Sequence, residues 1–317
     1  MKHLISIENL SKARIDRIME LADGLVENDD WEDQLDGKTL INLFLEPSTR
    51  TRISFELAMK KLGGHVSNII GKESSSMAKD EDLRDTLASL SQLGDVITVR
   101  NDSKLLEHDL EDSDVPVINA GDGDVEHPTQ ALIDLYTIRE NFPKLNGLNV
   151  LMMGDCKNSR AAHSFVGTCL KHDMKVATFS PHDLELPMHY MGIKDSENRA
   201  KIIKAKDLDV ALNAADVVWL IRFQKERVKV GHYNQHMATG EIKTTEHNYA
   251  GKCGFKEEYL SAISKTCIIL HPYPRGPELP RKIDKSRNAA YYAQMENSLF
   301  VRMAILKEIF EETVEEE

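Results

Sequence analysis

One ten-residue segment constrains this chain more than any other: residues 43–52, with the sequence LFLEPSTRTR. An apolar run from Thr39 to Leu45 ends abruptly in small hydroxyl residues and two arginines. Apolar residues then recur at helical spacing until the glycine pair at 63–64. This pattern predicts a buried strand, a tight turn and the N-terminus of a helix.

The turn after this strand has the composition of a phosphate site. The first turn of a helix leaves backbone N–H groups without partners, at the positive end of the helix dipole. Ser48, Thr49 and Thr51 add hydroxyl donors, and Arg50 adds a charged fork that matches phosphate oxygens. The alternative is an ordinary helix cap made by Ser48 or Thr49, with both arginines in solvent.

The rest of the chain alternates between apolar runs and amphipathic stretches, which predicts parallel sheets covered by helices. The predicted strands are 39–45, 66–70, 96–99, 115–119, 149–154, 175–179, 217–221 and 267–270. The predicted helices are 12–27, 48–62, 83–93, 128–141, 160–171, 208–214, 256–263 and 289–312.

A chain of 317 residues is long enough for two domains of about 150 residues each. Residues 143–147 (PKLNG) form a turn-rich boundary before a fresh strand. We therefore expect two doubly wound α/β domains, each a parallel sheet with helices on both faces. One is residues 1–142 with the C-terminal helix 289–317, and the other is residues 143–288. Because ligands bind at the carboxyl ends of parallel strands, the active site is expected in the cleft between the domains.

The charge balance excludes several classes of partner. The chain has 40 Lys and Arg against 52 Asp and Glu, for a formal net charge of −12, which disfavours nucleic acid and acidic membranes. No apolar run approaches the roughly 20 residues of a membrane span, and the start does not look like a signal peptide, so the expected location is cytoplasmic. The four cysteines and twelve histidines show no metal-ligand spacing, so neither metal nor cofactor is expected.

In the first half, two further strand ends carry polar side chains. Arg100 follows the strand 96–99, and His127 and Gln130 open the helix at Pro128. Residues three apart at a helix start project toward the same side, so His127 and Gln130 can act together. A structural cap is an equal alternative for His127.

In the second half, Arg160 opens a helix and Arg222 follows a strand, with Gln224 two residues later. An arginine at a helix start is unfavourable for the dipole, which favours an anionic partner. The Gly-x-Gly-x-x-Gly pattern of a dinucleotide site is missing from the turn at 154–160.

Two loops remain ambiguous. The segment 271–275 (HPYPR) is stiffened by prolines and offers carbonyls to a ligand amide, or is simply a rigid loop. The segment 74–81 (SSSMAKDE) is polar and is otherwise typical of solvated surface.

Taken in order, these motifs resemble the aspartate/ornithine carbamoyltransferase family over nearly the whole chain. The resemblance rests on residues 44–52, 127–134, 154–160, 222–227 and 294–303. The ornithine branch usually has a His-Cys-Leu-Pro segment where this chain has residues 271–274 (HPYP), which favours aspartate as the acceptor. The resemblance implies transfer of the carbamoyl group of carbamoyl phosphate to L-aspartate, giving N-carbamoyl-L-aspartate and phosphate, a step of pyrimidine biosynthesis.

The resemblance also implies roles for individual residues. Carbamoyl phosphate would be bound by Ser48, Thr49, Arg50, Thr51, Arg100, His127, Gln130, Pro272 and Tyr273. Within that set, Arg50, Thr51 and His127 would be catalytic, because they would polarise the carbamoyl carbonyl. Aspartate would be bound by Arg160, Arg222 and Gln224.

The same family likeness implies partners. Ser75 and Lys79 would reach the active site of a neighbouring subunit in a homotrimer, and a separate regulatory chain is possible in this family. Two departures leave alternatives open. Asp80 replaces the glycine of a common Lys-Gly-Glu pattern, and the segment 240–255 is long and polar. They are compatible with a different amino-acid substrate, or with a non-catalytic binding protein on the same scaffold.

Overall fold

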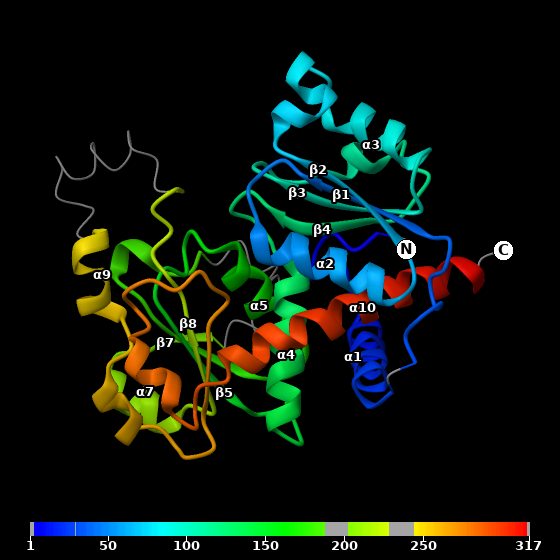
Figure 1. Cartoon of the computed structure of the whole chain (residues 1–317). Helices are drawn as coiled ribbons and strands as arrows, with labels where there is room; N and C mark the ends of the chain where they lie inside the picture. Colours follow the sequence, from blue (N-terminus) through cyan, green and yellow to red (C-terminus); the bar gives the residue numbers. More distant parts are fainter. Residues whose placement is uncertain (1–2, 29, 188–201, 228–243, 316–317) are drawn as a thin grey trace. The chain divides into compact units, whose positions relative to one another are not determined.

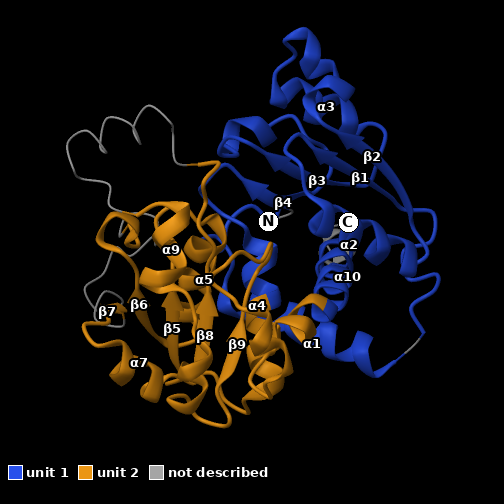
Figure 2. Ribbon diagram, turned by 60° about the vertical axis from the view of Figure 1, so that its left-hand side comes forward, with its two compact units in different colours: residues 1–133, 296–317 blue, residues 134–295 orange. Residues whose placement is uncertain are grey.

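The computed structural model describes residues 3–28, 30–187, 202–227 and 244–315 (Figure 1). The chain forms two compact units (Figure 2). Unit 1 comprises residues 1–133 and 296–317, and unit 2 comprises residues 134–295. Each unit is built on a parallel sheet with helices, which confirms the predicted α/β class. The assignment of residues 1–142 and 143–288 to different substrates, and a site in the cleft between them, stay predictions.

The sheet of unit 1 has four parallel strands in the order β2-β1-β3-β4. The strands are β1 (Thr39–Phe44), β2 (His65–Ile70), β3 (Val96–Asn101) and β4 (Val117–Asp122). The chain goes from β1 outward to β2 and then returns to the other side of β1 as β3. The winding direction therefore reverses between β1 and β3, and such a switch point is where doubly wound sheets bind ligands.

The crossover helices α2 (Thr49–Lys61) and α3 (Leu83–Ser91) pack on this sheet, because each must bury an apolar stripe. Unit 1 also contains α1 (Lys12–Glu27), the start of α4 (Pro128–Asn141) and most of α10 (Tyr291–Glu315). In Figure 1, α2 and α3 lie on opposite faces of the sheet. Leu87 of α3 packs with Leu43 and Val99 in a fully buried cluster. Three 3-10 turns, η1 (Lys72–Ser74), η2 (Ser76–Lys79) and η3 (Glu107–Leu110), complete the unit.

The sheet of unit 2 has five parallel strands in the order β7-β6-β5-β8-β9. They are β5 (Asn149–Met153), β6 (Lys175–Phe179), β7 (Ile202–Lys204), β8 (Val217–Leu220) and β9 (Ile268–Leu270). The helices are α5 (Arg160–Lys171), α7 (Leu208–Ala214) and α9 (Glu246–Cys253), with 3-10 turns η4 (His182–Leu184), η6 (Glu257–Ser261) and η7 (Arg281–Lys285). Here the winding direction reverses between β5 and β8, which gives unit 2 a switch point of its own.

Several element predictions were wrong in detail. The helix expected at 256–263 is a 3-10 turn of five residues, and the strand expected at 115–119 runs from Val117 to Asp122. Strand β7 was missed because three residues on an exposed sheet edge carry no periodic signal. Helix α9 was missed because its segment contains Asn248 and Gly251, which are poor helix formers. The expected long loop thus contains a helix, and its residues 240–243 lie outside the described part of the chain.

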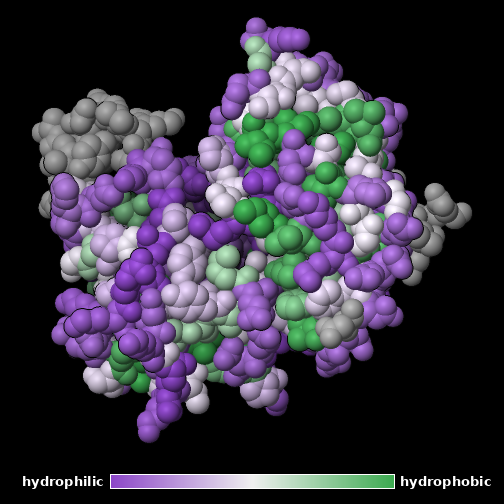
Figure 3. Space-filling view, viewed as in Figure 1, coloured by the Kyte–Doolittle hydropathy of each residue, from purple (hydrophilic) through white to green (hydrophobic). Residues whose placement is uncertain are grey.

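The surface differs between the units on the face drawn in Figure 3, where apolar residues gather over unit 1 and polar residues cover much of unit 2. Unit 1 exposes Ile53 and Leu57 by 40% and 46%, one turn apart on α2.

None of the described helices could cross a membrane. All four cysteines are buried free thiols. Within the described ranges, no cluster of histidine, cysteine and acidic side chains is suited to a metal ion.

Candidate active site

The polar side chains that follow the strands of unit 1 lie at neighbouring positions, at the carboxyl ends of the strands. Because β1, β3 and β4 are adjacent and parallel, the residues that follow them emerge side by side. A hydrogen bond of 2.9 Å from the Leu45 amide to the Arg100 carbonyl ties the first two strand ends together. This group is called the unit 1 site below: Ser48, Thr49, Arg50, Thr51, Arg100, His127 and Gln130.

The turn into α2 does not use the hydroxyl of Ser48 as a cap. Ser48 occupies the N-cap position with an extended backbone, but its side chain makes no capping hydrogen bond. Reading Ser48 as an ordinary cap is therefore wrong. Thr51 is buried within the first turn, whereas Arg50 is exposed there. The turn thus combines helix-terminal N–H groups with hydroxyls and a guanidinium, as an oxyanion site requires.

Arg100 lies at the end of β3, where its guanidinium is held on two sides. Its Nη2 atom is 3.1 Å from a carboxylate oxygen of Glu46, and its Nη1 donates to the carbonyl of Ala120 at 3.3 Å. The side chain is only 12% exposed. A fixed, mostly buried cation at this edge suits an anionic ligand, since little side-chain entropy remains to be lost.

His127 and Gln130 both belong to the start of α4, as predicted. The backbone carbonyl of His127 accepts the N–H groups of Gln130 and Ala131 at 3.0 and 3.3 Å, so His127 does begin the helix. Its imidazole is buried, and Nδ1 lies 3.4 Å from the hydroxyl of Thr129. The backbone carbonyl of His127 thus serves the start of the helix, whereas its imidazole is a separate group that can contact a ligand.

Ser75 and Lys79 lie on the 3-10 turns that follow the edge strand β2. The hydroxyl of Ser75 donates to the Lys72 carbonyl at 2.9 Å, and Lys79 is exposed. Asp80 ends the second turn in the left-handed region, with φ 64° and ψ 19°. That backbone favours glycine, and aspartate is one of the few other residues that tolerates it.

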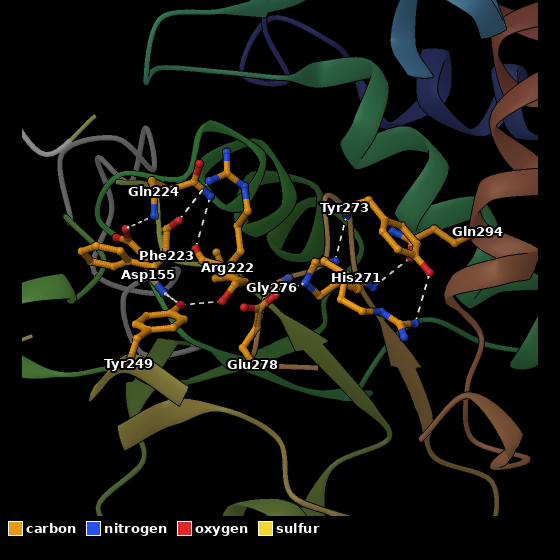
Figure 4. Close-up of polar contacts among 12 residues, drawn as sticks. Asp155, Arg222, Phe223, Gln224, Tyr249, His271, Tyr273, Gly276, Glu278 and Gln294 are labelled. Carbon is orange, nitrogen blue, oxygen red and sulfur yellow. Dashed lines mark hydrogen bonds and ion pairs between the residues drawn. The ribbon is translucent and has the colours of Figure 1, made fainter. Parts of the chain in front are cut away.

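In unit 2, one buried carboxylate joins the two strand ends at the switch point (Figure 4). Asp155 follows β5, and its Oδ1 accepts the backbone and side-chain N–H groups of Asn158 at 3.1 and 2.9 Å. Its Oδ2 accepts the backbone N–H of Gln224, beyond β8, at 3.0 Å. Burial raises the pKa of Asp155 to about 6, against the opposing effect of these hydrogen bonds.

A tyrosine reinforces the same junction from α9. The Tyr249 hydroxyl accepts the N–H of Asp155 at 2.6 Å and donates to the carbonyl of Ile221 at 2.5 Å. Gly154 lies directly under this bridge with φ 123°. A Cβ atom there would come within 2.3 Å of both the Ile221 carbonyl oxygen and the Tyr249 hydroxyl. Only glycine fits at this position.

The two arginines of this region are placed by that junction. Ser159 caps α5 by accepting the N–H of Ala162, and Arg160 is its buried first residue, with 4% exposure. Arg222 follows β8 and forms a two-pronged pair with Glu226, with Nη1 3.0 Å from Oε2. Burial opposes the charged form of Arg222, but Glu226 outweighs it and raises the pKa of the guanidinium. These residues are called the unit 2 site: Asp155, Arg160, Arg222 and Gln224.

A third polar segment follows β9. The imidazole of His271 accepts the N–H of Tyr273 at Nδ1, at 2.9 Å, and its Nε2 lies 2.8 Å from Glu278. Burial lowers the pKa of His271. Because Nδ1 accepts the N–H of Tyr273, the ring proton lies on Nε2. Tyr273 has φ 53°, a left-handed backbone that is uncommon for an aromatic residue. Hydrogen bonds of His271 hold this loop, and both predicted alternatives for it, a ligand site or a loop without a ligand, stay predictions.

Sequence reasoning missed the buried residues that hold these segments. They are Asp134, Asp155, Tyr249, Glu278 and Gln294, whose side chains contact the site residues or the backbone around them. Asp155 offered one local signal, because an acidic residue directly after a buried strand and a glycine is unusual. Asp134 and Gln294 lie inside the motifs 127–134 and 294–303, but neither motif indicates that they bond to each other. Tyr249 and Glu278 belong to no motif quoted above.

Comparison with known proteins shows which family the chain belongs to. Residues 2–140 match the model of the aspartate/ornithine carbamoyltransferase carbamoyl-P binding domain. Residues 146–309 match that of the Asp/Orn binding domain. The chain belongs to the aspartate/ornithine carbamoyltransferase family.

Individual relatives and solved structures indicate which branch of this family the chain is similar to. The chain is 38% identical to the aspartate carbamoyltransferase catalytic subunit of Archaeoglobus fulgidus, over 98% of this chain and 99% of that one. The catalytic subunit of M. jannaschii aspartate transcarbamoylase has a TM-score of 0.83 at 36% identity, with 98% and 99% of the two chains covered. The Trypanosoma cruzi aspartate transcarbamoylase in complex with carbamoyl phosphate and aspartate has a TM-score of 0.86 at 31% identity, with 96% of each chain covered.

Proposed function

We propose that this chain is a catalytic subunit that transfers the carbamoyl group of carbamoyl phosphate to the amino group of L-aspartate. The products are N-carbamoyl-L-aspartate and phosphate, a step of pyrimidine biosynthesis. One observation carries the proposal: each unit has its polar side chains at its own switch point, with a phosphate-type turn in unit 1 and the arginines Arg160 and Arg222 in unit 2. One anion-binding site for each substrate is what the reaction needs.

The unit 1 site is proposed to hold carbamoyl phosphate. The N–H groups and hydroxyls of residues 48–51 bind the phosphate, together with Arg100. Arg50, Thr51 and His127 donate to the carbamoyl oxygen, and Gln130 with the carbonyls of Pro272 and Tyr273 holds the carbamoyl NH2. The mostly buried guanidinium of Arg100 and the uncapped turn at Ser48 support this assignment.

The unit 2 site is proposed to hold aspartate. Arg160 and Arg222 bind the two carboxylates, and Gln224 assists from the same turn as Arg222. The support is geometric, because Asp155 ties the turn before Arg160 to the turn that carries Gln224. Two cations at a fixed spacing favour a dicarboxylic amino acid over a basic one.

The residues assigned above are matched to the steps of the reaction. The neutral amine nitrogen attacks the carbamoyl carbon, the bond from that carbon to the phosphate oxygen breaks, and the departing phosphate takes the proton that the amine loses. Negative charge grows on the carbonyl oxygen in between. Removing one fixed donor from such an oxygen costs about 3–4 kcal/mol in comparable sites. Arg50, Thr51 and His127 are the donors assigned to it.

The assembly is part of the proposal. The chain forms a homotrimer in the cytoplasm, in which Ser75 and Lys79 complete the site of a neighbouring subunit, and a separate regulatory chain is a further partner. The exposed apolar residues Ile53 and Leu57 on α2 support a subunit contact through unit 1. Size-exclusion chromatography with light scattering measures the assembly directly.

The deciding experiment is an amino-acid panel. The protein is incubated with carbamoyl phosphate and either L-aspartate or another amino acid, including L-ornithine, and the ureido product is measured. We expect product with aspartate alone. Product with a different amino acid would favour the alternative suggested by Asp80. Absence of any product would favour a binding protein on this scaffold.

A further inference from the structure

A chain of buried hydrogen bonds leads from α4 to the loop after β9. Asp134 is fully buried, and its two carboxylate oxygens accept the indole N–H of Trp219 at 2.9 Å and the amide of Gln294 at 2.6 Å. The other end of that amide, Oε1, accepts the backbone N–H of His271 at 2.9 Å. The imidazole of His271 continues the chain to the N–H of Tyr273 (Figure 4).

The residues Asp134, Gln294 and His271, which form this hydrogen-bonded chain, are called the relay below. The last hydrogen bond of the relay, from the N–H of Tyr273 to His271, has a geometric consequence. The N–H of Tyr273 and the carbonyl of Pro272 belong to one planar trans peptide group, so they point in opposite directions. An acceptor that fixes the N–H therefore also aims the carbonyl. Within the described residues, no donor bonds to the Pro272 carbonyl, although the peptide is held on its other side.

The imidazole cannot turn to another partner. Its Nδ1 accepts from Tyr273 and its Nε2 donates to Glu278, which also accepts the N–H of Gly276 at 2.8 Å. His271 and Glu278 are each 1% exposed, and Gln294 is 2% exposed. Buried polar groups are costly unless they are paired, and both ring nitrogens of His271 are paired here, which fixes the orientation of the imidazole.

We propose that His271, supported by Gln294 and Asp134, is a positioning residue that aims the Pro272 carbonyl at the NH2 of carbamoyl phosphate. This rests on the proposed function, since it assigns the relay to one substrate group. The relay acts on the carbamoyl end of the substrate only. The phosphate end is assigned above to other residues, 48–51 and Arg100.

The test exploits that division of the substrate. Carbamoyl phosphate and inorganic phosphate are titrated into each variant by calorimetry, because phosphate lacks the group that the relay serves. His271→Gln keeps a donor for Glu278 but loses the acceptor for Tyr273. We expect its affinity for carbamoyl phosphate to fall about tenfold, with phosphate affinity changed less than about twofold.

His271→Asn is the rescuing variant, because its Oδ1 replaces Nδ1 as the acceptor. We expect it to keep carbamoyl phosphate affinity within about threefold of the unsubstituted protein. Gln294→Ala leaves the imidazole in place but frees the loop backbone, and is expected to lose about threefold for carbamoyl phosphate alone. It provides the same readout should His271→Gln not fold.

A matched control is Asn288→Ala in the same unit. Asn288 is also buried, and its side chain donates to the carbonyls of Cys267 and Ser264 at the other end of β9. It should lower stability without changing the ratio of the two affinities. An equal loss of both ligands in His271→Gln, or a loss in His271→Asn as large as in His271→Gln, would overturn the inference. Failure of the proposed function would instead show in the unsubstituted protein, as no product and no preference for carbamoyl phosphate over phosphate.

Discussion

The two sites are built in different ways. In unit 1, the phosphate turn consists of helix-terminal backbone N–H groups, hydroxyls and the exposed cation Arg50. In unit 2, the cation Arg160 is 4% exposed, and a buried carboxylate ties its turn to the next strand end. The phosphate turn at residues 48–51 is local in sequence, whereas the groups of the unit 2 site come from segments far apart.

The contrast has a physical reason. A phosphate group has several equivalent oxygens, so a helix N-terminus with a few hydroxyls recognises it without exact placement of side chains. Two carboxylates at a fixed separation require two guanidinium groups at a matching separation. That distance is maintained only if the strand ends are locked together, which is what Asp155 and Tyr249 do. Four substitutions test this contrast.

The largest effect is expected at Arg50, an exposed side chain in the unit 1 site. Arg50→Ala should lower kcat by about 10²–10³-fold, because it removes a donor from the developing oxyanion. The melting temperature should hardly change, since little is buried. Arg52→Ala is the matched control, because Arg52 lies on the same helix and pairs with Glu56 at 3.1 Å. An equal loss of kcat in Arg52→Ala would show that charge alone matters.

The next largest effect concerns stability in unit 2. Gly154→Ala places a Cβ atom 2.3 Å from a carbonyl and from the Tyr249 hydroxyl, at a strained φ. We expect a loss of about 3 kcal/mol or more in the free energy of unfolding, measured by denaturant titration. Gly251→Ala is the control, because nothing lies within 4 Å of its Cβ and it is helical, so a gain of up to about 1 kcal/mol is expected. Similar values for both variants would contradict the packing argument.

The third prediction concerns the ionisation of Asp155. Its pKa is raised from 3.8 to about 6, so below pH 6 a proton occupies one of the oxygens that hold Asn158 and Gln224. The KM for aspartate should therefore rise as the pH falls through 6. Asp155→Asn should raise that KM by about 10- to 100-fold at pH 8 and remove this pH dependence. A variant with an unchanged pH profile of KM would exclude Asp155 as its origin.

The same shift has an opposite sign for stability. A carboxyl group with a raised folded-state pKa binds its proton more tightly when folded, so it favours the fold most below pH 4. That contribution is lost between pH 4 and 6 and stays lost above. The shift from 3.8 to about 6 corresponds to about 3 kcal/mol. The difference in unfolding free energy between the unsubstituted protein and Asp155→Asn, measured at pH 4 and pH 8, should change by up to that amount.

The smallest effect is expected at Asp80, next to Lys79 in unit 1. Asp80→Gly removes a carboxylate beside the proposed substrate lysine and suits the left-handed backbone there. We expect the KM for aspartate to fall about two- to fivefold, with stability unchanged within about 0.5 kcal/mol. Asp82→Asn, two residues further on, is the charge-matched control and should leave KM unchanged. A new amino-acid preference in Asp80→Gly would show that Asp80 sets substrate choice.

The sequence by itself was sufficient for the parts of this protein that depend on neighbours along the chain. The strand, turn and helix at 39–61, the other long parallel strands and the arginines after them follow from short-range periodicity and turn chemistry. The phosphate turn at residues 48–51 is readable for this reason, because helix-terminal N–H groups and adjacent hydroxyls are local features.

Only the tertiary structure decided which buried groups hold the unit 2 site together. Asp155 meets Gln224 across 69 positions, Tyr249 meets Ile221, and Gln294 joins Asp134 to His271. Sequence periodicity cannot report such pairs, because a buried hydrogen bond depends on where two distant segments come to lie and not on either segment alone. Its strength also depends on the exclusion of water, which is a property of the folded core.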